Sequence, residues 1–361
     1  LRISLMSFTN MSANNRHWLI YGANGYTGEQ IARAAASRGL TPVLAGRNRD
    51  AVEKLAHELH LPSRVFELTD ETEIARNLEG MTLVLHCAGP FQKTARPMAQ
   101  AAIAARSHYL DITGEITVYE DLLTLGRAAE AANTMLMPGA GFDVVPTDCI
   151  ATLLKQKMPD ATRLELAFIG GEQAASGSLK TALRQMPGGA VIREAGRLKS
   201  IPFFSRSRKI AIGNRSHEVY CIPWGDVSTA FVSTGIPNIA VYTAFPKMQA
   251  PLLKFAQPLM PLLKNGTVLS LADRLVETLG QNPKSDYLET AKSLVWGEVT
   301  NKDGQRIELA LETRDTYTVT IETALKITGE VLQGNFRPGF KTCTQVFGSE
   351  LVFSVPGTRF I

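Results

Sequence analysis

The sequence predicts an α/β fold, with a doubly wound parallel sheet followed by a second α/β domain that contains a mixed or antiparallel sheet. From His17 to about Asp148, short apolar runs alternate with helix-like segments, and the first run ends in glycines spaced three apart. After about Ile150, strand-like segments begin to follow one another without a helix between them. Alternating strands and helices form parallel sheets through right-handed crossovers, whereas directly connected strands pair antiparallel.

Composition sets the outer limits of the interpretation. The chain has 361 residues, of which 45% are hydrophobic and 20% charged, and its net charge is +4. This length suggests about two domains, and this mixture can bury a sizeable core. The charge is too small to demand a nucleic-acid partner, so we expect none. The four cysteines form no CxxC pair, which is typical of a reduced, cytoplasmic protein.

The chain contains no uninterrupted apolar run long enough to predict a transmembrane helix. Residues 1–16 are mixed in character and lack the apolar core of a signal peptide, so we expect a frayed tail. The segment APLLKFAQPLMPLLKN, residues 250–265, is interrupted by prolines and lysines. It predicts an amphipathic segment that is buried or lies at a surface, and it leaves a peripheral membrane contact open.

The predicted strands of the first domain can be followed in chain order. They are WLIYG (18–22), TPVLAGR (41–47), SRVFELTD (63–70), MTLVLHCAGPF (81–91), HYLDITGE (108–115) and TMLMPGAGFD (134–143). Helix-like segments such as RDAVEKLAHELHL (49–61) separate them, and in that segment Val52, Leu55 and Leu59 fall on one helical face. Runs that are apolar throughout predict strands buried on both faces, which makes this half a Rossmann-type domain.

The second half has a different rhythm. Residues 292–313 predict a hairpin that turns near Lys302–Gly304, and residues 318–335 predict a helix that ends at Gly334. We therefore divide the chain into a tail (1–16), a nucleotide-binding domain (17–149), a second domain for substrate or dimer contacts (150–337) and a C-terminal return onto the first domain (338–361).

The stretch LIYGANGYTG, residues 19–28, predicts a dinucleotide site. In such loops the first glycine permits the tight turn, the second lets the backbone approach the pyrophosphate, and the third allows helix and strand to pack closely. The helix N-terminus supplies amide donors and a positive dipole end. The glycines here are Gly22, Gly25 and Gly28, and they follow a strand and open a helix. A plain glycine-rich turn is the alternative interpretation.

The end of the second strand indicates which cofactor binds. NAD enzymes usually place a carboxylate there for the ribose 2′-hydroxyl, whereas this chain has Arg47, followed by Asn48. An arginine can pair with a 2′-phosphate that a carboxylate would repel, so Arg47 predicts NADP(H); a surface arginine without a ligand is the alternative. Asp70, at the end of the third strand, could approach the adenine or cap a helix.

Five motifs in this order carry a family resemblance: GANGYTG, AGRN, CAGPF, YLDITGE and GFDVVPTD. Together with the C-terminal GFKTCTQVFGSELV they resemble the saccharopine dehydrogenase-like oxidoreductases, including the trans-acting enoyl reductase branch. The resemblance implies an NADP-type Rossmann domain and a second α/β domain before a C-terminal return. Its members do not share one reaction, so it implies no substrate.

The resemblance also implies a set of cofactor-binding residues. The pyrophosphate loop comprises Gly22, Asn24, Gly25, Tyr26, Thr27 and Gly28. Arg47 lies at the adenosine phosphate, and from their places after the second and third strands we add Asn48 and Asp70 as candidates for the adenosine end. Ala88, Gly89, Pro90 and Phe91 lie on the nicotinamide side. Ligands of such sheets bind beyond the carboxyl ends of the strands, which agrees with this placement.

The catalytic acid is left open among three carboxylates, Asp111, Glu115 and Asp143, which lie with Tyr109 and Thr113 at the ends of the fifth and sixth strands. Burial could raise the pKa of any of them and make it a general acid. A helix cap or loop anchor is the competing role for Asp111 and Asp143.

Other reactive side chains are weaker candidates. Cys149 has no convincing histidine partner, so we interpret it as helix core, and His86 sits inside an apolar strand. Lys180 reads as part of a solvated helix face. No metal-binding constellation stands out, so we expect no metal.

The function predicted from these patterns is an NADP-dependent reductase of a C=C, C=O or C=N bond in a small, apolar acyl- or lipid-like molecule. Apolar segments of the second domain motivate the substrate class, through Phe203, Phe204, Tyr242, Phe245 and Phe255. We interpret Arg206, Arg208 and Arg215 as an exposed basic loop, not as anchors for a dicarboxylate. A non-catalytic NADP-binding protein, a saccharopine-type imine reductase and a homodimer stay open.

Overall fold

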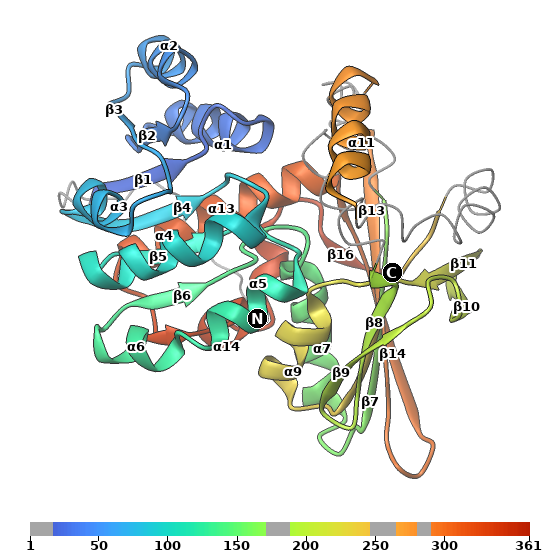
Figure 1. The fold of residues 1–361 in the computed structure, drawn as a ribbon. Helices are drawn as coiled ribbons and strands as arrows, with labels where there is room; N and C mark the ends of the chain where they lie inside the picture. The colour runs from blue at the N-terminus through green and yellow to red at the C-terminus, as the bar shows by residue number, and fades with distance from the viewer. Residues whose placement is uncertain (1–16, 171–187, 246–264, 280–289) are drawn as a thin grey trace.

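A computed structural model describes residues 17–170, 188–245, 265–279 and 290–361. Two sheets stand side by side, each with helices packed against it (Figure 1). The predicted fold class is confirmed, because the first sheet is parallel and the second is mixed. Residues 250–264, Phe255 among them, and Lys180 lie outside the described residues.

The first sheet has the strand order β15-β6-β5-β4-β1-β2-β3, and all its neighbours pair in parallel. Its strands are β1 (His17–Tyr21), β2 (Val43–Gly46), β3 (Ser63–Val65), β4 (Met81–His86), β5 (His108–Asp111), β6 (Met135–Met137) and β15 (Gly339–Phe340). Strands β1 and β4 at its centre are almost wholly buried, as their unbroken apolar sequences predict.

Helices cover both faces of this sheet (Figure 1). They are α1 (Tyr26–Ser37), α2 (Arg49–Leu59), α3 (Glu71–Leu78), α4 (Phe91–Ala105), α5 (Ile116–Leu123) and α6 (Gly126–Ala131). The predicted apolar face of residues 49–61 is confirmed in α2, where Val52 and Leu55 are buried.

The second sheet has the strand order β10-β11-β12-β7-β13-β14-β16, and β8 pairs with β12 and β9. Its strands are β7 (Arg163–Ile169), β8 (Ala190–Glu194), β9 (Arg197–Ile201), β10 (Ser207–Ile212), β11 (Arg215–Cys221), β12 (Asn238–Thr243), β13 (Lys292–Thr300), β14 (Arg306–Arg314) and β16 (Arg359–Phe360). β7 and β12 are parallel, whereas β13 and β14 form the antiparallel hairpin that the sequence predicts.

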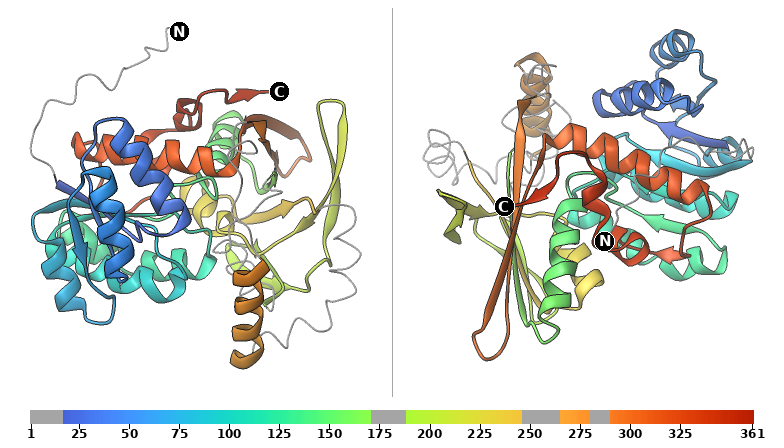
Figure 2. Two further views of the ribbon diagram at one scale, coloured as in Figure 1. Left: turned by 90° about the horizontal axis from the view of Figure 1, so that it is seen from above. Right: turned by 180° about the vertical axis from the view of Figure 1, so that it is seen from behind.

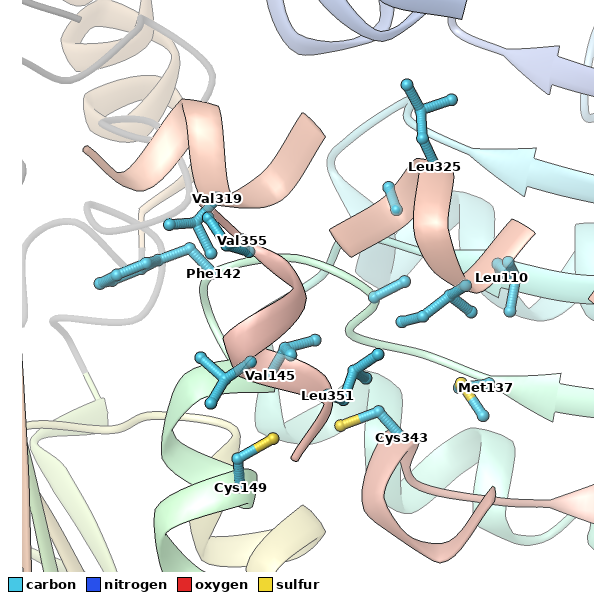
Figure 3. Packing of buried hydrophobic residues seen from close by; sticks show 14 of the residues in the cluster. Leu110, Met137, Phe142, Val145, Cys149, Val319, Leu325, Cys343, Leu351 and Val355 are labelled. Atoms are coloured by element: carbon cyan, nitrogen blue, oxygen red, sulfur yellow. The ribbon is translucent and has the colours of Figure 1, made fainter. Parts of the chain in front are cut away.

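Helices α7 (Val145–Lys157) and α9 (Asp226–Thr234) lie between the two sheets. α7 packs so closely on β13 that a Cβ at Gly297 would lie 2.5 Å from Ile150 and 2.8 Å from Leu154. Cys149 is fully buried in α7 and faces the same core, as Figure 3 shows. Arg193 of β8 also bridges the two domains, because its guanidinium lies 2.8 Å from Glu120 of α5.

The C-terminal third of the chain returns to the first domain earlier than the sequence suggests. Helix α13 (Thr316–Leu332), which we predicted in the second domain, packs against α1 and β4 of the first. Its residues Val319 and Leu325 join the core that also contains Leu110 (Figure 3). A helix with apolar residues on much of its surface must be covered, and the first sheet offers the free face.

The last segments of the chain divide between the two sheets. β15 pairs with β6 at the edge of the first sheet, and β16 pairs with β14 of the second. Between them lie α14 (Cys343–Phe347) and the short 3-10 helix η4 (Leu351–Ser354). The views in Figure 2 show this C-terminal segment running from α13 past the first sheet toward β14. The chain therefore crosses between the two domains three times, from β6 to β7, from β14 to α13 and from β15 to β16, and not through one linker.

Candidate active site

The loop between β1 and α1 turns sharply at Gly22, whose φ is +82°. The amides of Gly22 and Ala23 donate to the carbonyl of Ala45 at 2.8 and 3.0 Å, which ties the loop to the end of β2. The amide of Gly25 donates back to the carbonyl of Gly22 at 3.0 Å. The turn thus leads directly into the N-terminus of α1 (Tyr26–Ser37), the end of a helix at which backbone amides have no partner within the helix.

The three glycines meet three different surroundings. A Cβ at Gly22 would lie 2.8 Å from the amide nitrogen of Ala88, and one at Gly28 would collide with the carbonyl of Gly22. A Cβ at Gly25 would meet the carbonyl oxygen of Gly22 at 3.3 Å and is otherwise in open space. Gly22 and Gly28 are therefore required by the protein's own packing, whereas Gly25 leaves room in front of the helix N-terminus. This is the arrangement that a bound pyrophosphate needs.

Arg47 follows directly after β2 and is exposed. Among the described residues no carboxylate pairs with its guanidinium, whereas the neighbouring Arg49 pairs with Glu53 at 2.7 Å. Burial raises the pKa of Tyr21 at the end of β1 to about 12, and the charge of Arg47 opposes this shift. Arg47 therefore presents an unneutralised charge beside the glycine loop, where a 2′-phosphate would fit.

The neighbouring polar residues have structural work of their own. Asn48 caps α2 by accepting from the amide of Ala51 at 3.2 Å, and Asp70 caps α3 by accepting from the amide of Thr72 at 2.8 Å. Asn24 packs over the backbone of Gly46, because a Cβ there would lie 2.8 Å from the Asn24 Oδ1. The capping role that the sequence offered for Asp70 is present, and a contact of Asp70 or Asn48 with the adenosine stays a proposal.

The loop Ala88–Phe91 lies against the glycine loop through Ala88 and Gly22. The Thr94 hydroxyl donates to the carbonyls of Ala88 and Pro90 at 2.7 and 3.2 Å. Because that hydroxyl proton is used, the Thr94 oxygen accepts from Nε2–H of His86, which lies 3.0 Å away. Burial lowers the pKa of His86 to about 3, so the ring is neutral. His86 is thus a core residue that steadies the loop through Thr94.

The three candidate carboxylates differ in what surrounds them. Asp111 is saturated, because its carboxylate accepts from the amides of Thr113 and Gly139 at 3.0 and 2.9 Å and from the Tyr109 hydroxyl at 2.7 Å. Burial raises the pKa of Asp111 to about 6 against the effect of these hydrogen bonds. Asp111 therefore joins the ends of β5 and β6 and has the structural role that the sequence offered for it.

Glu115 connects these strand ends to the Ala88–Phe91 loop. Its side chain is buried and accepts from the amide of Phe91 at 3.2 Å. Its own amide donates to the Thr113 hydroxyl at 3.1 Å. Glu115 thereby fixes the start of α4 and brings a negative charge close to both Asp111 and Asp143.

Asp143 is partly buried in the loop after β6. Its carboxyl group packs over Gly114, where a Cβ would lie 2.7 Å from the Asp143 Oδ2. Burial, reinforced by Glu115, raises the pKa of Asp143 to about 7. Within the described part of the chain, no side chain or amide donates to this carboxyl group. Asp143 is therefore a carboxyl group that can hold a proton near neutral pH and that accepts no hydrogen bond from the residues the structure describes.

Residues 18–137 match the family model described as the saccharopine dehydrogenase NADP binding domain. This stretch is a saccharopine dehydrogenase NADP-binding domain. The NADP(H) predicted from Arg47 and the family inferred from the motifs are confirmed at the level of this domain. Two features of the described residues suit NADP(H): the Arg47 guanidinium pairs with no carboxylate among them, and the space at Gly25 is open.

Curated relatives resemble the same half of the chain. A probable mitochondrial saccharopine dehydrogenase-like oxidoreductase of Arabidopsis thaliana is 31% identical over 36% of this chain and 32% of its own length. The human saccharopine dehydrogenase-like oxidoreductase is 26% identical over 39% of this chain and 38% of its own. A trans-acting enoyl reductase of Mycobacterium bovis is 26% identical over 51% of this chain and 48% of its own. The chain thus matches only about a third to about a half of the length of these relatives.

The saccharopine dehydrogenase (L-Glu forming) of Saccharomyces cerevisiae shares the fold over nearly the whole chain. The match covers 96% of this chain and 99% of that one, with a TM-score of 0.62 and 11% identity. At this identity the likeness shows the fold alone. The second domain therefore shares the architecture of a dehydrogenase, while its own side chains must indicate what it binds.

The NADP-binding domain is completed by residues that the motifs did not reveal. The ring of Tyr26 stands edge-on to Tyr317 of α13 at 5.2 Å, and Trp224 donates from Nε1 to the carbonyl of Asp143 at 2.9 Å. Both partners lie far along the chain from the residues they contact, and no local sequence pattern predicts such pairs.

The structure corrects the interpretation of two arginines. Arg206 and Arg208 do not form an exposed basic loop, because they lie just before and within β10 and pair with Glu165 of β7. Sequence reasoning missed this because the β10–β11 hairpin curls back over the sheet. Arg215 is exposed, as predicted.

Within the described ranges, no three potential ligands among His, Cys, Asp and Glu gather as a metal site. No helix in the described part of the chain is both long and apolar enough to cross a membrane.

Proposed function

We propose that the protein is an NADP-dependent oxidoreductase in which Asp143 donates the proton that accompanies reduction of a C=C, C=O or C=N bond. The observation that carries this proposal is the partly buried Asp143 carboxyl group, which no described residue pairs with and which lies beside Glu115, itself in contact with the Ala88–Phe91 loop. A general acid works best when its pKa lies near the operating pH. Bound NADPH would supply the hydride, while the chain orients the substrate and supplies the proton.

An apolar acyl- or lipid-like substrate is supported by the aromatic side chains next to Asp143. The ring of Phe168 lies 6.0 Å from Phe142 and 4.9 Å from Trp224, which holds the Asp143 carbonyl. The same cluster continues through Ile222 to a second group of rings. That group consists of Phe203, Phe204 and Phe245. An apolar wall with few polar anchors suits an aliphatic chain.

One residue of the predicted wall is excluded. Tyr242 points to the opposite face of the second sheet, where its hydroxyl lies 3.0 Å from Glu165. Alternation along β12 explains the difference, because neighbouring residues of a strand face opposite sides.

A saccharopine-type imine reductase is the second candidate, because the yeast neighbour is named a saccharopine dehydrogenase. Such a substrate carries several carboxylates and would call for free arginines. Arg206 and Arg208 are already paired with Glu165, which favours the apolar substrate. A non-catalytic NADP-binding protein is the third candidate, and the raised pKa of Asp143 counts against it.

The test is NADPH oxidation measured with four substrate classes: acyl thioesters, lipid enones, aldehydes and amino-acid imines. We expect turnover with an acyl or lipid class and none in Gly25→Val, the matched variant that blocks the cofactor loop. Turnover with lysine- or glutamate-derived imines alone would refute the apolar substrate. Tight NADPH binding without oxidation in any class would refute the enzyme and favour the non-catalytic protein.

A further inference from the structure

The first two turns of α13 contact both loops that border the active site. Tyr317 meets Tyr26 of the glycine loop, with ring centroids 5.2 Å apart and ring planes at 90°. One turn later, Thr320 and Thr323 reach the loop that precedes Asp143. A rigid helix with contacts at both places fixes the distance between them.

Thr320 is held so that its oxygen must accept. Its hydroxyl donates to the carbonyl of Thr316 at 2.8 Å, and its oxygen accepts from the amide of Phe142 at 3.0 Å. A Cβ at Gly141 would lie 2.9 Å from the Thr320 methyl group, so the loop approaches the helix as closely as glycine allows. Thr323 adds a hydrogen bond of 2.8 Å to the carbonyl of Ala140.

Hydrogen bonds hold the backbone both just before Asp143 and at Asp143 itself. The preceding amide, that of Phe142, is held by Thr320, and its own carbonyl is held by Trp224. With both anchors in place the carboxyl group is pressed onto Gly114.

We propose that Thr320 is a positioning residue that sets where Asp143 stands relative to the cofactor loop, with Tyr317 as the contact on the cofactor side. The proposal rests on the proposed function, in which Asp143 donates the proton. Nothing in the family motifs includes α13, so the helix adds a third element to the active site beside the two loops.

Several groups face Asp143 and act on its titration. Glu115 comes from the loop after β5, Tyr119 from α5 and Asp226 from α9. All three are neutral or negative, and α13 contributes the uncharged Thr320. A movement of the Asp143 loop toward water would lower the pKa of Asp143, because these surroundings favour its protonated form.

The test is the titration of the Asp143 carboxyl group, followed by ¹³C NMR in the full chain, with the dissociation constant of NADPH measured in parallel. In Thr320→Val, which keeps the shape and removes the acceptor, we expect the Asp143 midpoint to fall by about one pH unit. We expect NADPH affinity to stay within about twofold and turnover to fall about tenfold or more. Thr320→Ser should restore both the midpoint and the turnover.

Thr328→Val is the matched control, because Thr328 is buried on the same helix and its hydroxyl has no hydrogen-bond partner in the described part of the chain. An unchanged Asp143 midpoint in Thr320→Val, or equal shifts in Thr320→Val and Thr328→Val, would overturn the proposal. If Thr320→Val does not fold, Thr320→Ala removes the same acceptor and undergoes the same titration. A wild-type protein that never oxidises NADPH would refute the proposed function, while the titration would still decide the role of Thr320.

Discussion

Two groups of partly or fully buried carboxylates in this protein differ in the charges that surround them. On the second sheet, Glu165 is 8% exposed and pairs with Arg206 and Arg208, and Arg208 also reaches Glu298 at 3.3 Å. At the ends of β5 and β6, Asp111 and Asp143 lie close to Glu115, and within the described ranges no Lys or Arg forms a salt bridge with Asp111 or Asp143. Arginines neutralise the charge of Glu165, whereas burial raises the pKa of Asp111 and Asp143 and favours their protonated forms.

The difference separates structure from chemistry. A carboxylate between two guanidinium groups stays ionised and serves packing, as the stacking of Arg208 over Trp296 at 4.6 Å illustrates. A carboxyl group without a cation must keep or release its proton as its surroundings dictate. Within the described ranges, Arg47 and the Asp143 carboxyl group have no salt-bridge partner, and the space at Gly25 is open; the proposed function places a ligand at all three.

The largest expected effect concerns the cofactor side of the molecule, at the open space in front of Gly25. Gly25→Val should weaken NADPH binding by more than about a thousandfold, about 4 kcal/mol, because the side chain fills the space in front of α1. Folding should survive, since Gly25 has φ −82° and ψ 158°, an extended conformation open to valine. Calorimetry and a thermal melt check the two halves. Normal NADPH affinity in the variant would show that the loop does not hold the pyrophosphate.

Asp143→Asn should lower turnover by about a hundredfold or more, because the amide cannot donate an acidic proton. NADPH affinity should be unchanged. Asp303→Asn, at the exposed turn of the β13–β14 hairpin, is the control and should keep full activity. Single-turnover rates decide the matter, and a rate within twofold of wild type would remove Asp143 from the mechanism.

In the group that is paired with arginines, Glu165→Gln should lower the stability of the fold and leave cofactor binding unchanged. It leaves Arg206 and Arg208, which are partly exposed, without their shared carboxylate, and we expect a loss of about 2 kcal/mol in the free energy of unfolding. Urea denaturation measures it. Glu194→Gln, in the exposed pair with Lys199, should leave the midpoint unchanged. A Glu165→Gln variant as stable as wild type would contradict the structural role of the pair.

Arg47→Ala should remove most of the preference for NADPH over NADH, because a charge-assisted pair with the 2′-phosphate is worth about 1.5–3 kcal/mol. This corresponds to a preference of roughly tenfold to a hundredfold. Arg49→Ala is the matched control, since Arg49 is already paired with Glu53. If Arg47→Ala kept the preference measured by calorimetry, another residue would have to read the phosphate.

The smallest effect is on stability as a function of pH. The folded pKa values of Asp111 and Asp143, about 6 and about 7, lie above the ordinary 3.8. Between about pH 4 and 7 the folded chain therefore holds more protons than the unfolded chain, and these groups stabilise it less as the pH rises. As the pH rises from 5 to 8, the free energy of unfolding of Asp143→Asn should therefore increase by about 1 kcal/mol relative to that of the wild type. Urea denaturation at each pH measures the free energy of unfolding, and a difference between the two proteins that stays constant from pH 5 to 8 would contradict the raised pKa.

Much of the fold was predictable because its signals are local. The alternation of apolar runs and amphipathic segments predicts the parallel sheet, and the turn at residues 302–304 predicts the β13–β14 hairpin. The placement of α13 was not predictable, because its apolar residues require a covered face without specifying which sheet provides it. The pairing of Arg206 and Arg208 with Glu165 was not predictable either, because it depends on how the β10–β11 hairpin folds back over the second sheet.

By itself the sequence determined the parts of the active site that lie within one turn of chain. The glycine spacing, Arg47 after β2 and the carboxylates after β5 and β6 are all set by local backbone geometry and strand ends. Only the tertiary structure distinguished those carboxylates, because Asp111 accepts from three donors where β5 meets β6, whereas none of the described residues donates to the Asp143 carboxyl group. It also brought Thr320 and Trp224 to the loop of Asp143 across long stretches of chain. Burial and hydrogen-bond partners, which set a pKa, are properties of the packed molecule and not of any segment alone.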